Sequence, residues 1–365
     1  MDNQLHYCAT DNEIYEVLMS SKQKMTDAVL LEIAKERGIF FSSKDSREVL
    51  ADKIALLPHD YHDLSLILEQ REHAGRSEKI TSVIFNAGLT MDDIKEVAKE
   101  YREQPQKDEK VLSYAEGNDR YVVKVKYSEM DYSRTRLIQR KPKEADIEFI
   151  VEGEQTTVRM PANHKSKEVF DKLKTRLDNR KKTDLPVALI EISEFDSAAQ
   201  RTSFFTSLIS TIPDFKLDNV TSVKVEPIDN DTRYDLDDDQ EIEQAKEEAL
   251  SLVRKVALAG ESLLASEEYQ SLQRKGFFIT SIIWRSKKIY APLSIVEFEA
   301  AFEEPHAGKG FKYSVRGALN FTGREYTKTL RPIIENLKQQ YLSLIEQTAM
   351  QVVAGIRAEA SKVEA

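Results

Sequence analysis

The densest basic stretch of the chain runs from Ser133 to Lys143, with the sequence SRTRLIQRKPK. It holds no acidic residue, and its five basic residues are Arg134, Arg136, Arg140, Lys141 and Lys143. Exposed cations at this density can bind a polyanion, because contacts to phosphates release condensed counterions. We expect an exposed loop or edge strand that binds nucleic acid, with Tyr127 and Tyr132 near enough in sequence to stack on bases. The alternative is a solvated strand edge, where basic residues block aggregation.

A second basic cluster lies along and just after a predicted helix from about Lys165 to Leu177. Its members are Lys165, Lys167, Lys172, Lys174, Arg176, Arg180, Lys181 and Lys182. The whole chain has a net charge of −10, yet residues 118–184 carry 17 basic and 12 acidic residues. This segregation predicts a basic face on an acidic protein. Such a face would bind DNA, with the duplex favoured, or an acidic protein partner.

The stretch from Met25 to Leu57 predicts two short helices joined by a turn. Thr26 or Asp27 can cap the first helix, and Gly38 follows its basic last turn as a stop. Ser42, Ser43 or Asp45 can cap the second helix, which Pro58 ends.

This pattern of apolar helix, Arg-Gly-Ile, small polar loop and second helix resembles the SAP and helix-extension-helix family. The residues that carry the resemblance are Leu31, Ala34, Arg37, Gly38, Ile39, Ser46, Arg47, Leu50 and Ile54. The resemblance implies that the loop and the second helix contact DNA, through Lys44, Arg47 and Lys53. A protein-docking or core hairpin is the alternative, since helical hairpins with a glycine turn are common.

The acidic run from Asp229 to Glu243 fails the template of a calcium-binding loop. Counting from Asp235, positions six and twelve are Gln240 and Lys246, where glycine and glutamate are needed. Acidic residues before a helix favour its N-terminal dipole, so we interpret the run as a helix entry. A second hypothesis is that it masks the basic segment until a polyanion displaces it.

No motif of a known catalytic site occurs in the chain, so we expect no cofactor and no metal. His59 and His62 follow Pro58 and are interpreted as the start of a surface helix rather than as metal ligands. A carboxylate–lysine nuclease stays an alternative, with Glu191 and Glu194 near a strand end, although no Glu-x-Lys tripeptide occurs.

The hydrophobic periodicity predicts an α+β protein with a helical N-terminal domain. Residues 1–105 are expected to be all helical, including a helix at Ile80–Phe85 that stops near Gly88. The polar segment around residues 106–117 is expected to be a linker, and residues 118–365 a mixed α/β-sheet domain. Sub-units of that domain would span 118–184, 185–275 and 276–365.

The order strand, strand, hairpin, strand, helix occurs over residues 120–177 and again over 277–345. This shared order predicts a duplicated unit, and an unrepeated α+β sheet is the alternative. A long C-terminal helix is expected to start near Tyr326 and to pack on the chain's own sheet.

The single cysteine, Cys8, allows no internal disulfide framework, and no apolar run reaches the roughly 20 residues of a membrane helix. We therefore expect a cytoplasmic protein without a signal sequence or a membrane partner. The preferred function is a non-enzymatic DNA-binding accessory subunit of a bacterial DNA-processing or anti-phage defence system. The alternatives are a protein-interaction scaffold, which would make the chain part of an oligomer or complex, and a divergent metal-dependent nuclease.

Overall fold

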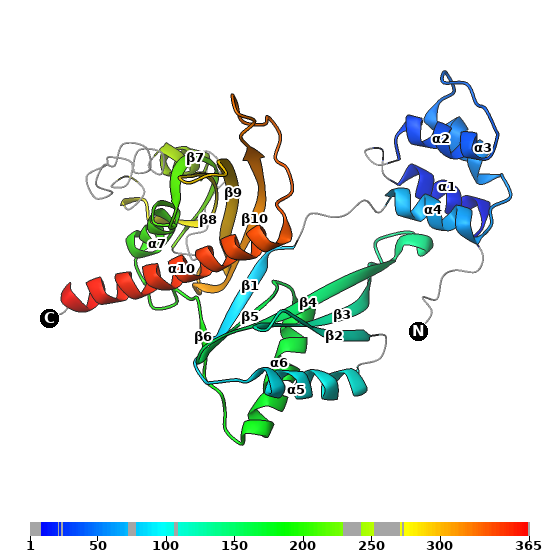
Figure 1. Ribbon diagram of the computed structural model, residues 1–365. Coiled ribbons are helices and arrows are strands. Elements are labelled where there is room, and N and C mark those ends of the chain that lie inside the picture. Colours follow the sequence, from blue (N-terminus) through cyan, green and yellow to red (C-terminus); the bar gives the residue numbers. More distant parts are fainter. Residues whose placement is uncertain are drawn as a thin grey trace. The chain divides into compact units, whose positions relative to one another are not determined.

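The computed structural model describes residues 9–20, 22, 25–71, 78–105, 109–228, 242–251, 271 and 274–363. It confirms the α+β class, with helices first, a large antiparallel sheet after them and a long helix at the C-terminal end (Figure 1). The helices are α1 (Asp11–Met19), α2 (Asp27–Glu36), α3 (Arg47–Ala55), α4 (Tyr61–Arg71), α5 (Met91–Glu103), α6 (His164–Lys181), α7 (Ala198–Ser210) and α10 (Glu335–Val363), with a 3-10 turn η1 (Arg136–Ile138).

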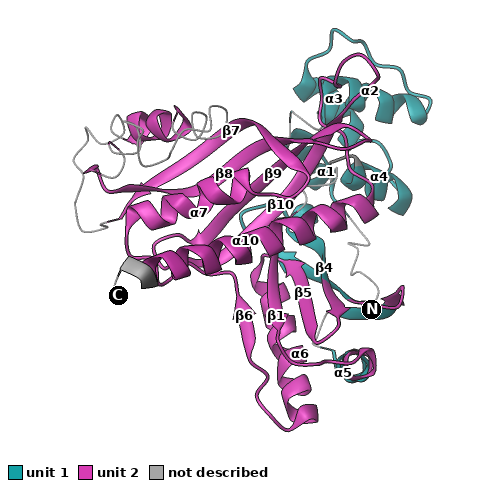
Figure 2. Ribbon diagram, turned by 60° about the vertical axis from the view of Figure 1, so that its left-hand side comes forward, with its two compact units in different colours: residues 1–77, 96–114, 123–146 teal, residues 78–95, 115–122, 147–365 magenta. Residues whose placement is uncertain are grey.

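The strands are β1 (Ile80–Phe85), β2 (Lys110–Glu116), β3 (Arg120–Met130), β4 (Arg140–Glu152), β5 (Gln155–Pro161), β6 (Val187–Leu189), β7 (Phe215–Pro227), β8 (Phe277–Lys288), β9 (Ser294–Glu304) and β10 (Lys309–Asn320). They are ordered β2-β3-β4-β5-β1-β10-β9-β8-β7, and β6 pairs with β1. The chain forms two compact units (Figure 2). The first unit, teal in the figure, comprises residues 1–77, 96–114 and 123–146. The second unit, magenta, comprises residues 78–95, 115–122 and 147–365.

The expected N-terminal helical hairpin is confirmed as α2 and α3. Thr26, one of the two predicted caps, accepts a hydrogen bond from Val29 N at the start of α2. The predicted caps of the second helix, Ser42, Ser43 and Asp45, are wrong, because Ser46 caps α3 by accepting from Val49 N. Gly38 ends the turn after α2 at φ +71°, a conformation that glycine adopts without a steric penalty. The helices α1 to α4 enclose an apolar core that includes Leu18, Leu30, Leu50, Ile54 and Ile67.

The prediction of a helix at Ile80–Phe85 is wrong, because this segment is the central strand β1. It pairs with β5, β6 and β10. Its four consecutive buried residues, Ser82 to Phe85, are typical of a strand covered on both faces. β-Branched and aromatic side chains favour this pleated environment over a helix, and tertiary packing decides between the two.

The segment expected to be a linker also contains regular structure. Helix α5 continues to Glu103, and β2 spans Lys110–Glu116, so only residues 104–109 separate the two elements. The polar composition that predicted a linker reflects the exposure of most β2 side chains.

The expected repetition is confirmed in the element order. Strands β3, β4 and β5 precede α6, as β8, β9 and β10 precede α10. The repetition extends further toward the N-terminus, because β1, α5 and β2 stand before the first set, as β6, α7 and β7 stand before the second. The named elements of each set therefore follow the order β-α-β-β-β-β-α, and in the second set helical residues 242–251 stand between β7 and β8.

Helix α10 begins at Glu335, later than the predicted start near Tyr326. Residues before it fold back on β10, with bridges from Phe321 to Tyr326 and from Ala318 to Arg331. Pro332 disfavours a helical conformation at Arg331, which accounts for the later start. As expected, α10 packs on the chain's own sheet, where Leu342, Ile345 and Ala349 are fully buried.

A buried polar cluster fixes α10 to the sheet. Arg159 on β5 donates to Glu346 on α10, with Nε 2.6 Å from Oε1, and the Tyr313 hydroxyl on β10 donates to the same carboxylate. Burial raises the pKa of the Tyr313 hydroxyl. None of the helices that the structure describes is both long and apolar enough to cross a membrane.

Candidate nucleic-acid interface

The predicted DNA-binding loop is anchored in the helical core. It is named here the paired loop, residues Asp131–Lys143. Its centre, Leu137 and Ile138, is only 5% and 4% exposed and belongs to the apolar core of α1 to α4. Beside them, the Arg136 guanidinium pairs with Glu13 on α1. The two apolar residues inside the basic sequence therefore dock the loop to the helices.

Carboxylates accompany the cations of the paired loop. Asp131 accepts from Arg134 Nε at 2.7 Å and from Lys141 Nζ at 2.9 Å. Lys143 Nζ lies 2.9 Å from Glu129. Hydrogen bonds from the Ser133 hydroxyl, Lys141 and Arg134 hold the pKa of Asp131 well below its usual range. The hydrogen bond from Arg136, with those from Thr10, lowers the pKa of Glu13 to about 2.

Two further residues of the loop region, Arg140 and Tyr127, are also poorly placed for a polyanion. Arg140 is half-buried, and its Nε has no hydrogen-bond partner among the described residues. Tyr127 is buried, so its ring cannot stack on a base, whereas Tyr132 is exposed.

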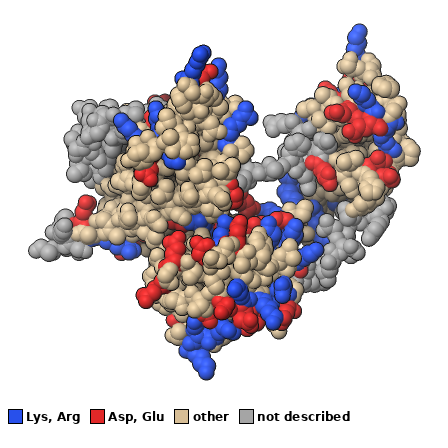
Figure 3. Space-filling view, viewed as in Figure 1, with Lys and Arg blue, Asp and Glu red and all other residues tan. Residues whose placement is uncertain are grey.

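Most cations of the second predicted cluster, on α6, are also paired with acidic residues. Glu168 pairs with Lys165 and Lys172, while Lys174 pairs with both Asp178 and Asp184. Arg180 and Lys181 pair with Asp93 of α5. Partial burial raises the pKa of Asp93, but the hydrogen bonds from Lys181 and Thr90 outweigh it and hold this pKa well below its usual range. Arg176 donates to the Lys172 carbonyl, and Lys167 and Lys182 are exposed. Figure 3 shows blue and red atoms interspersed around α5 and α6.

The helical hairpin places its three predicted DNA contacts in different environments. Arg47 is 8% exposed and donates to the carbonyls of Met25 and Leu18, so it is a structural residue that no polyanion reaches. Lys53 pairs with Asp45 at 2.9 Å. Lys44 is exposed and makes no ion pair with a described residue.

A different group of cations, which the sequence does not single out, lies where β7 begins and where β8 and β10 end. We name it the strand-end cluster: Lys216, Lys287, Lys288, Arg324, Lys328 and Arg331. All but the half-buried Lys288 are exposed, and none has a carboxylate within 4.0 Å among the described residues. Asp214, Asp218 and Glu325 occur in the same segments without pairing to them. Figure 3 shows blue atoms with little red at the top of the body that carries β7–β10.

Two of these lysines face each other across paired strands. Lys216 on β7 is the direct register partner of Lys287 on β8. Like charges at directly opposed positions of a sheet are destabilising. The Lys287 ammonium also lies 5.4 Å from the centroid of the Tyr326 ring, a cation–π contact that provides no negative charge. An anion bound between the lysines would relieve their repulsion.

Backbone contacts hold the segments of the cluster together. Ile289 N donates to Asp214 O at 2.9 Å and joins the end of β8 to the start of β7. Phe321 N donates to Leu293 O at 3.3 Å and joins the end of β10 to the turn between β8 and β9. Gly317 lets the following loop lie on β10, because a Cβ there would be 2.8 Å from Arg331 O.

The density of basic residues along the sequence could not reveal the strand-end cluster. Its members come from three separate segments, each with only one to three cations, whereas Ser133–Lys143 concentrates five. The one local signal is the pair Lys287-Lys288 at the end of an otherwise apolar predicted strand. Strand register, which the sequence does not give, brings Lys216 beside them.

Other predicted features carry no site within the described part of the chain. His59 contacts Arg37 and Ile54 O, which agrees with a structural role. The described residues contain no group of three His, Cys, Asp or Glu side chains that could hold a metal ion. Of the acidic run, residues 229–241 lie outside the described residues, so the masking hypothesis stays a prediction.

Comparisons with known proteins give no relative from which a site could be transferred. No family model matches the sequence, and no curated protein matches it significantly.

Proposed function

We propose that this chain is a non-enzymatic polyanion-binding protein, with DNA as its preferred ligand, working in the reducing cytoplasm that a single cysteine suits. The observation that supports this is the strand-end cluster, six cations without carboxylate partners in the described part of the chain. Neighbouring surface cations without acidic partners repel one another. Phosphates of a polyanion neutralise them, and the binding releases condensed counterions. Of the predicted contacts, Lys44, Lys167 and Lys182 also have no acidic partner among the described residues, and they would extend the surface.

Salt-titrated binding of the full chain to labelled DNA tests this proposal. We expect measurable affinity at 50 mM salt that falls linearly with the logarithm of salt concentration. Four to six phosphate contacts on a single strand give a slope of about −3 to −4. No binding at low salt, or binding that is independent of salt, would contradict the proposal.

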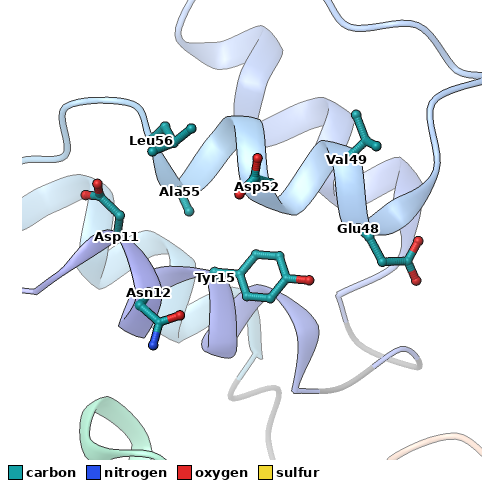
Figure 4. Close-up of a pocket in the computed structure, with 8 residues that line it drawn as sticks. All are labelled: Asp11, Asn12, Tyr15, Glu48, Val49, Asp52, Ala55 and Leu56. Carbon is teal, nitrogen blue, oxygen red and sulfur yellow. The ribbon is translucent and has the colours of Figure 1, made fainter.

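A second candidate function, a protein-interaction scaffold, is favoured by a groove between α1 and α3. The groove has a volume of about 480 Å³ and is lined by Asp11, Asn12, Tyr15, Glu48, Val49, Asp52, Ala55 and Leu56. In Figure 4 the Tyr15 ring lies between the two helices, with Leu56 near one end and Val49 near the other. Val49 and Leu56 are exposed apolar side chains, and every charged lining residue is acidic. This combination suits a basic amphipathic helix of a partner protein.

Binding of a labelled Leu/Lys amphipathic helical peptide tests this candidate against a scrambled peptide of equal charge. We expect the amphipathic peptide to bind more tightly and Leu56→Ser to abolish the difference. Equal binding of both peptides would show general charge attraction and would rule out the groove.

A further inference from the structure

Exposed aromatic rings stand among the unpaired cations of the strand-end cluster. Tyr290, in the turn between β8 and β9, is 64% exposed, and Phe321, at the end of β10, is 39% exposed. Ile289 beside Tyr290 is exposed as well. Large apolar side chains grouped on a surface commonly mark an interaction site, because their exposure to water is unfavourable.

Backbone and ring contacts join the segments that carry these rings and the cations. The hydrogen bond from Phe321 N to Leu293 O brings the end of β10 beside the turn that carries Tyr290. The Phe321 ring lies 5.2 Å from that of Tyr326, centroid to centroid, with the planes tilted by 53°. The Lys287 ammonium lies over the Tyr326 ring, 5.4 Å from its centroid.

From this arrangement we infer that the strand-end cluster binds single-stranded nucleic acid, with unpaired bases stacked on Tyr290 and Phe321 and phosphates on the surrounding cations. The inference rests on the proposed polyanion binding and narrows its ligand. A duplex presents phosphates to the lysines but hides the faces of its bases, except at its ends. Only a single strand offers both groups side by side, and base stacking on aromatic side chains tolerates any sequence.

Basic and aromatic residues lie close together in the sequence of the strand-end cluster, which suits a single strand of nucleic acid. Lys287 and Lys288 precede Tyr290 by two or three residues, and Phe321 precedes Arg324 by three. The paired loop offers the opposite case, since its exposed Tyr132 lies next to Asp131, which already holds two cations. Tyr132 is therefore a matched control, an exposed tyrosine beside basic sequence whose cations are neutralised.

The test compares binding of the full chain to labelled (dT)20, (U)20 and a 20-base-pair duplex, with the double variant Tyr290→Ala and Phe321→Ala. We expect the variant to bind (dT)20 on the order of tenfold or more weakly and to bind the duplex within about twofold of the parent. The control Tyr132→Ala should bind all three ligands like the parent. A preference between (dT)20 and (U)20 reports whether the strand is DNA or RNA.

Folding is checked by circular dichroism, and Tyr290→Phe, which keeps a ring, should retain (dT)20 affinity. If the parent binds the duplex with an affinity that falls as salt rises, but the double variant loses nothing on (dT)20, this inference is wrong and the proposed function stands. If the double variant loses (dT)20 and duplex affinity equally, stacking is also excluded. If the parent binds none of the three ligands at low salt, the proposed function itself fails.

Discussion

The paired loop and the strand-end cluster contain similar numbers of cations but use them differently. In the paired loop, Arg134 and Lys141 share Asp131, and Arg136 pairs with Glu13. In the strand-end cluster, Lys216 and Lys287 face each other, and no carboxylate of the described residues lies within 4.0 Å of either. The first group of cations holds the loop through ion pairs, and we propose that the second group binds a ligand.

This difference shows that cation density in a sequence measures charge but not its availability. Acidic partners can come from distant segments, as Glu13 does, and they cancel a local excess of positive charge. Unpaired cations can also be gathered from distant segments, as β7, β8 and the loop after β10 show. Four predictions test this contrast, from the largest expected effect to the smallest.

Ile138→Ala should destabilise the helical core by about 2–5 kcal/mol, because it removes a buried side chain and leaves a cavity. Hydrogen-exchange protection of the α1 to α4 amides measures the effect. Tyr132→Ala, in the same loop but exposed, is the control and should cost less than about 0.5 kcal/mol. Unchanged protection in Ile138→Ala would show that the paired loop is not docked.

Arg47→Ala should reduce the free energy of unfolding of the helical core by about 1–3 kcal/mol, since it leaves the Met25 and Leu18 carbonyls without their donor. Once the variant is folded at low temperature, its DNA affinity should stay within twofold of the parent. Denaturant unfolding and DNA titration measure the two effects separately. A folded variant with strongly weakened binding would restore Arg47 as a DNA contact.

Gly317→Ala should weaken DNA binding by about tenfold without removing any charge, because the loop that carries Arg324 and Lys328 is displaced. The new Cβ would be 2.8 Å from Arg331 O, and φ at this position is +153°. Gly153→Ala is the control, since its φ is also positive but no atom lies within 4 Å. Equal DNA affinity of the two variants would show that the loop carrying Arg324 and Lys328 does not contribute to DNA binding.

The Glu13–Arg136 contact should make the docking of the paired loop sensitive to acid. The pKa of Glu13 is lowered to about 2 in the folded protein, so the stability it contributes is full above about pH 4.5 and is lost as pH falls toward 2. We expect an effect below about 1 kcal/mol, because Arg136 is largely exposed. The stability difference between the parent and Glu13→Gln, measured by urea unfolding, should shrink between pH 5 and 2.5. A constant difference would contradict this assignment.

The sequence predicted the elements whose signals are local. The cap Thr26, the stop at Gly38 and the repeated strand–helix order were all readable from residue type and spacing. The strand at Ile80–Phe85 was missed, because its partners β5, β6 and β10 lie 70 or more residues away.

The candidate site was harder to predict from the sequence than the fold, because it is formed by contacts between residues far apart in the chain. Charge density could nominate Ser133–Lys143, but neither the burial of Leu137 and Ile138 nor the pairing with Glu13 is visible in the local sequence. The register that opposes Lys216 and Lys287 is set by bulged pairing of β7 with β8, which alternation of residue types does not predict.

The central claim is tested most directly by two triple variants that remove the same charge. One carries Lys216→Ala, Lys287→Ala and Lys288→Ala, and the other carries Arg134→Ala, Lys141→Ala and Lys143→Ala. In salt titrations with (dT)20, the first should lose on the order of a hundredfold in affinity at 50 mM salt and flatten the slope by about 2. The second should stay within about threefold of the parent, with an unchanged slope, because its cations are already paired with carboxylates. Equal losses, or a larger loss in the second variant, would contradict the claim that the strand-end cluster is the interface.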